Sequence, residues 1–174
     1  FMEYNVTDLF DALTFKSGAT LPNRLTLSPL TNLQSNRDGT LSDDEFKWLT
    51  MRAQGGFGLT MTCASHVQAV GLGFPGQLGC FSDDHLEGLT RLAAGINQEG
   101  SVSILQLHHA GMRSPEDDIG EKPHCASDNA DTGARGITHD EVLQLRDDFI
   151  AAAVRADRAG FSGVELHGAH GYMI

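Results

Sequence analysis

The amino-acid sequence predicts an α/β fold in which helices cover a parallel sheet. Short apolar runs alternate with longer segments whose apolar residues recur at helical spacing, in the order β-α-β-α-β-α-β. No composition shift or linker interrupts this alternation. We therefore expect residues 1–174 to belong to a single domain without an internal boundary.

Composition and charge restrict the class of protein. The formal net charge of −11 argues against a general nucleic-acid binder, because such a protein needs a basic surface. The longest apolar run, residues 149–154, is too short to span a bilayer, and no signal peptide is recognisable. The three cysteines form no CxxC pair, which favours free thiols in a reducing compartment. We therefore expect a cytoplasmic protein with no nucleic-acid or membrane partner.

The first 30 residues predict a hairpin followed by a strand. Residues 13–21 contain two β-prone runs, and Gly18 between them supplies the turn. Residues 24–30 form a short β run. We place Pro29 at the end of this strand, because proline cannot donate a hydrogen bond within a sheet.

Three helices are marked by their first residues. Ser42-Asp43-Asp44-Glu45 and Thr138-His139-Asp140-Glu141 match the capping box, and Ser82-Asp83-Asp84 is a third helix start. Glycines at residues 55–56, 100 and 160 end these helices. The apolar residues of the second helix fall on one face: Leu86, Leu89, Leu92, Ala93 and Ile96.

Three further strands are expected at residues 57–65, 101–107 and 161–167. Residues 108–137 are predicted to form a long irregular loop, and loops of this length are usually functional or mobile. Ligands of parallel α/β folds bind at the carboxyl ends of the strands. Small and polar residues gather at these ends: Ser28 to Thr31, Cys63 to Ser65, Gln106 to Gly111, and His167, His170 and Tyr172.

The last strand end carries two imidazoles and a phenol, separated only by small residues. His167 and His170 could bind zinc or simply hydrogen-bond the backbone, and Tyr172 could simply pack. We expect no metal site, because no acidic or cysteine partner lies at ligand spacing. Gln106 lies inside an apolar strand, where a buried amide needs partners that the edge of a ligand would provide. We expect His108 to be structural or to lie at the rim.

This combination of motifs resembles the old yellow enzyme family of flavin-dependent ene-reductases. The order and spacing of the motifs match those of the family across essentially the whole chain. Each motif alone is a weak signal, and only the combination is specific for the family. They are Asn23-Arg24, Ser28-Pro29-Leu30-Thr31, Arg52-Ala53, Gly55-Gly56, Gly58-Leu59, Gln106-Leu107-x-His109-Ala110-Gly111 and the run from Ala159 to Tyr172.

The resemblance implies a TIM (β/α)8 barrel that holds FMN non-covalently at its C-terminal mouth. It implies NADH or NADPH as the reductant and a small-molecule enone or related electrophilic alkene as the substrate. His167 and His170 would bind the carbonyl oxygen of the alkene, and Tyr172 would donate a proton. By position, the residues against the flavin would be Pro29, Leu30, Thr31, Ala64, Gln106 and His167.

The chemistry of these side chains agrees with the implied roles. Hydride addition to an α,β-unsaturated carbonyl compound builds negative charge on oxygen, which two N–H donors stabilise. The α-carbon then needs a proton, and a phenol with a pKa of about 10 stays protonated at neutral pH. The family commonly has Arg directly after the His-Ala-Gly motif, whereas Met112 precedes Arg113 here, so neither receives a role. Some branches have Cys at the position of Thr31 and an aromatic residue at that of Leu33.

A full barrel needs ~250 residues. We therefore expect these 174 residues to be about the first four β/α units plus the N-terminal hairpin of a longer ene-reductase, inactive without the C-terminal half of the barrel. The alternative is a non-catalytic half-barrel that acts as a structural or assembly module. Within the enzyme class, dienoyl-thioester reductases and amine dehydrogenases share the barrel. Either kind of protein could form a homo-oligomer.

Overall fold

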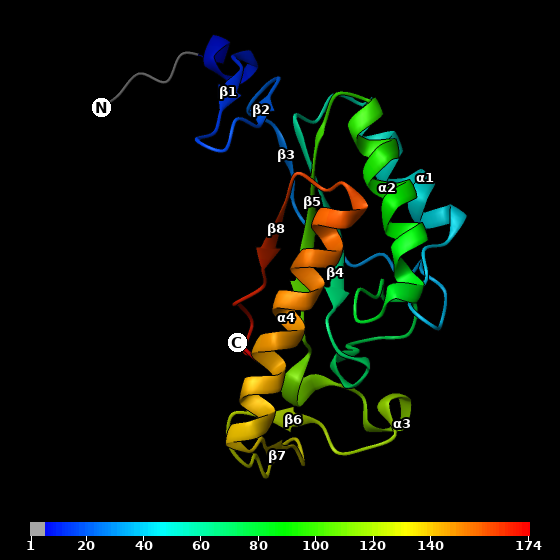
Figure 1. Cartoon of the computed structure of the whole chain (residues 1–174), viewed down its shortest axis with the longest axis vertical. Coiled ribbons are helices and arrows are strands. Elements are labelled where there is room, and N and C mark those ends of the chain that lie inside the picture. Colours follow the sequence, from blue (N-terminus) through cyan, green and yellow to red (C-terminus); the bar gives the residue numbers. More distant parts are fainter. Residues whose placement is uncertain (1–5) are drawn as a thin grey trace.

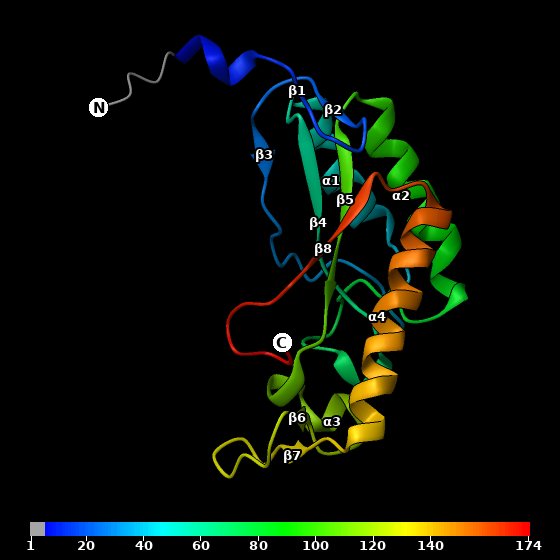
Figure 2. The ribbon, with the colours of Figure 1, turned by 60° about the vertical axis from the view of Figure 1, so that its left-hand side comes forward.

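Four parallel strands form the central sheet in the computed structural model of the chain, which describes residues 6–174. Across the sheet they are ordered β3 (Thr26–Leu27), β4 (Leu59–His66), β5 (Val102–His108) and β8 (Gly163–Leu166). The three longer helices, α1 (Asp43–Gln54), α2 (Leu86–Gln98) and α4 (His139–Ala159), lie on one side of the sheet and leave the other face open (Figures 1 and 2). The predicted parallel sheet with helical cover is confirmed.

The register of β4, β5 and β8 aligns their carboxyl ends. Ala64 of β4 lies opposite Gln106 of β5, and Gln106 lies opposite Glu165 of β8. A register shift between Met61 and Ala64 interrupts the β4–β5 ladder just before this point. After β8, the backbone N–H of His167 still donates to the carbonyl of Leu107, over 3.0 Å. The residues that follow β4, β5 and β8 therefore start from one end of the sheet, whereas β3 ends earlier, with Leu27 opposite Thr60.

The core lies between the sheet and the helices. Leu89, Leu92 and Ile96 of α2 are fully buried, as their helical spacing predicts. They pack in one cluster with Leu105 and Leu107, which alternate along β5 and so point to the same face. Burying each of these side chains contributes about 1.5–3 kcal/mol. This layer fixes the sheet against the helices and leaves the opposite face available for a site.

The helix caps are formed largely as the sequence predicts. The Thr138 hydroxyl accepts from the N–H of Glu141, whose carboxylate accepts from the N–H of Thr138. Gly160 ends α4 with a φ of 88°, which glycine adopts readily. Ser42 also caps α1, but Glu45 does not close that capping box because its side chain turns into the core. Ser82 starts a short 3₁₀ turn, η3 (Asp83–His85), that leads into α2.

The structure differs from the prediction at the shorter elements. The strand expected over residues 24–30 is reduced to β3, and the loop over residues 108–137 is partly ordered. Its elements are η4 (Gly111–Arg113), α3 (Glu116–Ile119) and the paired strands β6 (His124–Cys125) and β7 (Arg135–Gly136). Two-residue strands are too short to leave a periodic sequence signal.

The predicted hairpin is present as β1 (Leu13–Thr14) and β2 (Thr20–Leu21), with Gly18 at a φ of 92°. It lies at the amino ends of the strands, far from the loops that carry β6 and β7 (Figures 1 and 2). Two further 3₁₀ turns are η1 (Val6–Phe10) and η2 (Ala69–Gly71).

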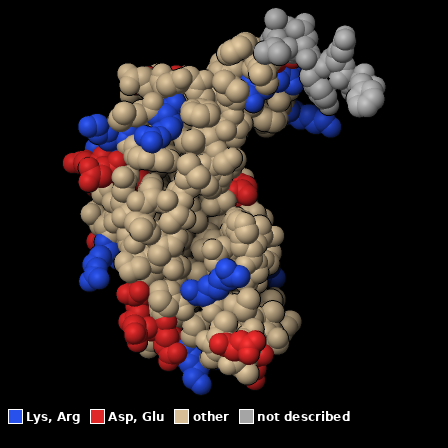
Figure 3. Space-filling model, turned by 180° about the vertical axis from the view of Figure 1, so that it is seen from behind, with Lys and Arg blue, Asp and Glu red and all other residues tan. Residues whose placement is uncertain are grey.

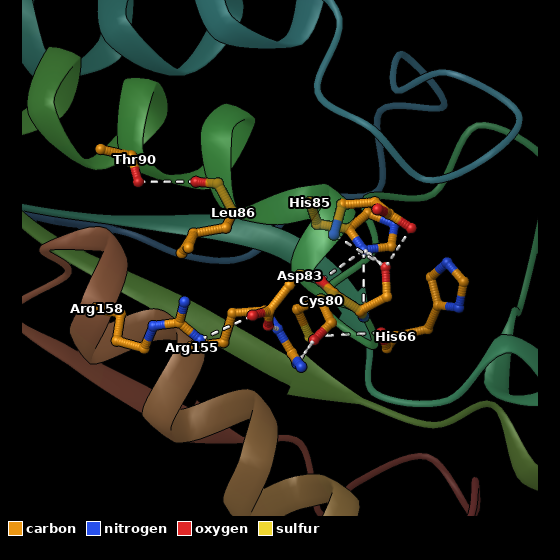
Figure 4. A network of polar contacts seen from close by, with 10 residues as sticks. His66, Cys80, Asp83, His85, Leu86, Thr90, Arg155 and Arg158 are labelled. Carbon is orange, nitrogen blue, oxygen red and sulfur yellow. Dashed lines mark hydrogen bonds and ion pairs between the residues drawn. The ribbon is translucent and has the colours of Figure 1, made fainter.

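Asp83 ties the start of α2 to the end of α4. Its carboxylate accepts from Arg155 Nε over 2.8 Å and from Arg158 Nη1 over 3.0 Å. Arg155 also donates to the carbonyl of Cys80, so its guanidinium connects α4 to the segment before α2 at two points (Figure 4). The arginines hold the pKa of Asp83 below its usual value, Arg155 having the larger effect.

Seen from behind, charged side chains gather mainly toward the two ends and along one side, and a broad uncharged surface that is hollowed lies between them (Figure 3). Within residues 6–174, no helix is both long and apolar enough to cross a membrane.

Candidate active site

A cavity of about 410 Å³ lies where the strands end. Every residue predicted for the site lines it: Pro29, Leu30, Thr31, Ala64, Gln106, His167, His170 and Tyr172. The structure therefore brings together segments that are more than 140 residues apart in sequence. Four lining residues were not predicted as site residues: Phe74, His108, Glu165 and Ala169. The volume lies in the range of small-molecule and cofactor sites.

Gln106 lies at the centre of the polar wall of this cavity. It is 95% buried, and its amide nitrogen donates to Glu165 Oε2 over 2.6 Å. The same nitrogen lies 3.2 Å from Nδ1 of His167. Both contacts arise because the three side chains come from neighbouring strand ends with matched register. The carbonyl oxygen of the amide remains an acceptor for a ligand.

His167, His170 and Tyr172 form one compact group. Nδ1 of His170 lies 3.2 Å from Nε2 of His167, and the rings of His167 and Tyr172 are 5.6 Å apart. A turn with positive φ at His170 (62°) and Gly171 (63°) bends the chain back after β8. Such a φ is uncommon for a residue with a side chain, and this conformation places the second imidazole beside the first.

Close approach of the backbone holds this group in place. Gly111 has a φ of 60°, and a Cβ atom there would lie 2.7 Å from the backbone of Tyr172 and Met173. The N–H of Met173 donates to the carbonyl of His109 over 3.3 Å. A glycine is therefore required at position 111 for the segment with Tyr172 to pack against the end of β5.

His108 belongs to the site, although the sequence indicated only a structural or rim role. Its ring packs edge-on against Tyr172 with the centroids 4.6 Å apart, and its Nδ1 lies 3.1 Å from the amide nitrogen of Gln77. Burial lowers the pKa of His108 to about 4, so the ring is neutral at pH 7. The period of two along β5 was the available signal, because it places His108 on the same face as Gln106.

A buried carboxylate supports the segment that carries Thr31. Glu45 of α1 is fully buried and accepts from the Asn32 amide over 3.3 Å and from the Ser35 hydroxyl. The thiol of Cys63, next to Ala64 in the site, donates to it over 2.7 Å. Burial, together with this carboxylate, raises the pKa of the Cys63 thiol. Glu45 thus connects the two flanks of the cavity through the core.

The lining suits a flat heterocycle with a polar edge. Pro29, Leu30 and Ala64 supply apolar or small surface, which allows a ring to approach the backbone closely. Gln106 and Thr31 supply hydrogen-bonding atoms at the margin. Within the described residues, no group of three His, Cys, Asp or Glu side chains is placed to hold a metal ion. These features fit a flat ring such as a flavin.

Comparisons with known proteins identify the family. The profile of the NADH:flavin oxidoreductase / NADH oxidase family matches residues 8–174. A probable NADH-dependent flavin oxidoreductase of Bacillus subtilis, YqiG, is 38% identical over 95% of this chain and 45% of its own length. An NADH:acrylate oxidoreductase of Vibrio harveyi is 37% identical over 97% of this chain and 17% of its own length.

The solved structure of an old yellow enzyme homologue from Zymomonas mobilis superposes with a TM-score of 0.87 at 30% identity, over 95% of this chain and 50% of that one. The chain thus has the expected TIM-barrel class of fold and spans about half the length of such relatives. FMN and a nicotinamide reductant are the cofactors that the family implies. The chain belongs to the NADH:flavin oxidoreductase / NADH oxidase family, which confirms the resemblance to the old yellow enzymes.

Proposed function

We propose that the protein is an FMN-dependent oxidoreductase that reduces the C=C bond of α,β-unsaturated carbonyl compounds with NADH or NADPH. One observation carries this proposal: a single cavity joins the Gln106 amide, the paired imidazoles and a phenol beside apolar surface. Family membership supports the flavin. The relative named for acrylate supports an activated alkene, since acrylate is an α,β-unsaturated carboxylate.

Different residues of this chain would bind the cofactor and the substrate. Pro29, Leu30 and Ala64 would lie against the flavin, and Gln106 and Thr31 would hydrogen-bond its polar edge, with His167 beside it. When bound, FMN supplies the hydride that adds to the β-carbon of the alkene. The protein's own task is then to orient the substrate and to stabilise the charge that develops on it.

His167 and His170 would bind the carbonyl oxygen of the substrate. Nε2 of His167 lies 3.2 Å from Nδ1 of His170, so the two rings are close enough for one substrate oxygen to replace this contact and accept from an N–H group of each ring. Negative charge grows on this oxygen during hydride addition, and each donor aimed at it strengthens its hydrogen bond. Removing one such donor typically costs about 3–4 kcal/mol of transition-state stabilisation.

Tyr172 would donate the proton to the α-carbon. Its half-buried ring is oriented edge-on by His108 and lies beside both site imidazoles. The neutral state of His108 at pH 7 keeps a positive charge away from the phenol. The proton donor and the carbonyl-binding pair therefore come from one short segment, which fixes their relative positions.

The test is substrate-dependent oxidation of the reductant. The purified protein that contains this chain is loaded with FMN, desalted and mixed with NADH or NADPH, with and without 2-cyclohexenone. We expect retained flavin and enone-dependent oxidation of the reductant, with the saturated ketone as product. An enoyl thioester serves as the second substrate to separate the thioester-reductase alternative. Loss of flavin on desalting, or no turnover of either alkene, would contradict the proposal.

A further inference from the structure

We propose that Glu165 is a positioning residue: it fixes the orientation of the Gln106 amide and, through it, the tautomers of His167 and His170. This inference rests on the proposed function for its role in turnover. The hydrogen-bond geometry that supports it is independent of any reaction.

Glu165 and Gln106 form a close charge-assisted contact. Glu165 Oε2 and the amide nitrogen of Gln106 are 2.6 Å apart, across the paired strands β8 and β5. An ionised carboxylate only accepts hydrogen bonds, so the amide must present its NH₂ group and not its oxygen. Among residues 6–174, no Lys or Arg forms an ion pair with Glu165. Within the described chain, the amide is therefore the partner of this half-buried charge.

The orientation of the amide determines the proton positions on both rings. The second N–H of Gln106 points to Nδ1 of His167, 3.2 Å away, so Nδ1 accepts and the proton of that ring lies on Nε2. This Nε2–H donates to Nδ1 of His170, again over 3.2 Å. The proton of His170 then also lies on Nε2. The Glu165 carboxylate thus sets the direction of the hydrogen bonds that link Gln106, His167 and His170.

This direction matters for binding a carbonyl oxygen. An imidazole with its proton on the wrong nitrogen presents a lone pair to the substrate oxygen in place of a donor. A reversed Gln106 amide would place its oxygen against the Glu165 carboxylate, which is repulsive. Without Glu165, the two amide orientations become similar in energy, and His167 can take either tautomer. The flavin-facing atom of Gln106 would change at the same time.

The test reads the tautomers directly. Long-range ¹H–¹⁵N correlation spectra of the FMN-loaded protein, labelled at histidine nitrogens, distinguish a protonated from an unprotonated ring nitrogen. We expect His167 and His170 to carry the proton on Nε2 in the unmodified protein. Glu165→Ala should give a mixture of tautomers at His167. Glu165→Gln, which keeps the side-chain size, should give a smaller shift in the same direction. Glu87→Gln, an exposed change on α2, is the matched control.

Turnover supplies the second readout. In Glu165→Ala, kcat for enone reduction should fall by about 10- to 100-fold, the loss typical when a partner that orients a metal-binding imidazole is removed, with KM for the nicotinamide unchanged. Unchanged tautomers in both Glu165 variants would overturn the inference, whatever the activity. Absence of enone reduction in the unmodified protein, with the tautomer shift present, would instead overturn the proposed function and leave the role of Glu165 in place.

Discussion

At the scale of single residues, three buried histidines are held neutral around the strand ends. Burial is the main cause in each case: it lowers the pKa of His66 and of His108 to about 4, and that of His109 to about 3. The bonding of His109 agrees with this state. Its Nδ1 accepts from the N–H of Gly111, and its Nε2 lies 3.0 Å from the side-chain oxygen of Gln68.

These pKa values predict that stability falls on acidification. Between pH 4 and pH 6.5, the unfolded chain binds protons at these histidines that the folded chain does not, so stability rises with pH. Lowering the pH from 7 to 5 should therefore destabilise the protein, by at most about 2 kcal/mol per histidine. Urea unfolding at several pH values measures the slope. His66→Gln should reduce it, and an equal slope in this variant would contradict the assignment to His66.

Site residues differ in how far the sequence predicts them. Gln106 was predictable, because an amide inside an apolar strand needs an explanation. The capping-box motif was a sufficient explanation for an acidic residue at position 45. The sequence therefore did not indicate that the Glu45 carboxylate is buried. Glu165 lies in a short strand, and polar residues commonly alternate with apolar ones along a strand, so this glutamate gave no signal of a site. Its contact with Gln106 depends on strand register, which a single sequence does not specify.

At the level of elements, two arginines of α4 with different surroundings bind the segment that leads into α2. The Arg155 side chain is 12% exposed and bonds both Asp83 and the carbonyl of Cys80, whereas Arg158 is 50% exposed and bonds Asp83 alone. An exposed ion pair contributes little, since water and salt screen it. Leaving a buried carbonyl without its donor costs more.

We therefore predict unequal effects of two matched substitutions. Arg155→Met should lower the free energy of unfolding by about 1–3 kcal/mol, through the lost partner of the Cys80 carbonyl. Arg158→Met should change it by about 0.5 kcal/mol or less. Chemical denaturation of both variants measures the difference. Equal losses would show that the exposed ion pair, and not the buried contact, carries the connection between the helices.

Long elements were predictable and short ones were not. The caps at Ser42, Ser82 and Thr138 and the glycine stops place all three long helices, because these signals lie within a few residues of each other. The reduced strand β3 depends on pairing with β4, which is distant in sequence, and β6 and β7 are too short to show a period. In loop 108–137, Arg135 donates to Glu141 at the start of α4 over 2.7 Å, a contact that no sequence pattern marks.

At the scale of the whole molecule, the sheet has two edges, β3 and β8. Apolar side chains are exposed along α4 and on the edge strand β8: Ile150, Val154, Val164 and Leu166. An open edge and exposed apolar surface usually mark a region that is covered in the functional protein. Together with relatives of about twice this length, they support our proposal that residues 1–174 form the N-terminal half of one barrel domain.

The proposal predicts weak cofactor binding by these 174 residues. In such barrels the phosphate site generally lies on the loops after strands seven and eight, beyond the four strands present. The chain should therefore hold the ring of FMN without anchoring its phosphate. Titration of the purified 174-residue chain, followed by flavin fluorescence, should show weak quenching. Tight stoichiometric binding would contradict the half-barrel account. A colourless, stable dimer would favour the structural-module alternative.

In the proposed function, the cluster of His167, His170 and Tyr172 after β8 activates the substrate. Rapid mixing of the FMN-loaded, pre-reduced protein with 2-cyclohexenone under anaerobic conditions measures the reaction at this cluster alone. We predict that His167→Ala and Tyr172→Phe each slow flavin reoxidation by about 100-fold, because one loses a carbonyl donor and the other the proton donor. His139→Ala, at the exposed start of α4, should react at the unmodified rate. Unchanged reoxidation in both site variants would contradict the account.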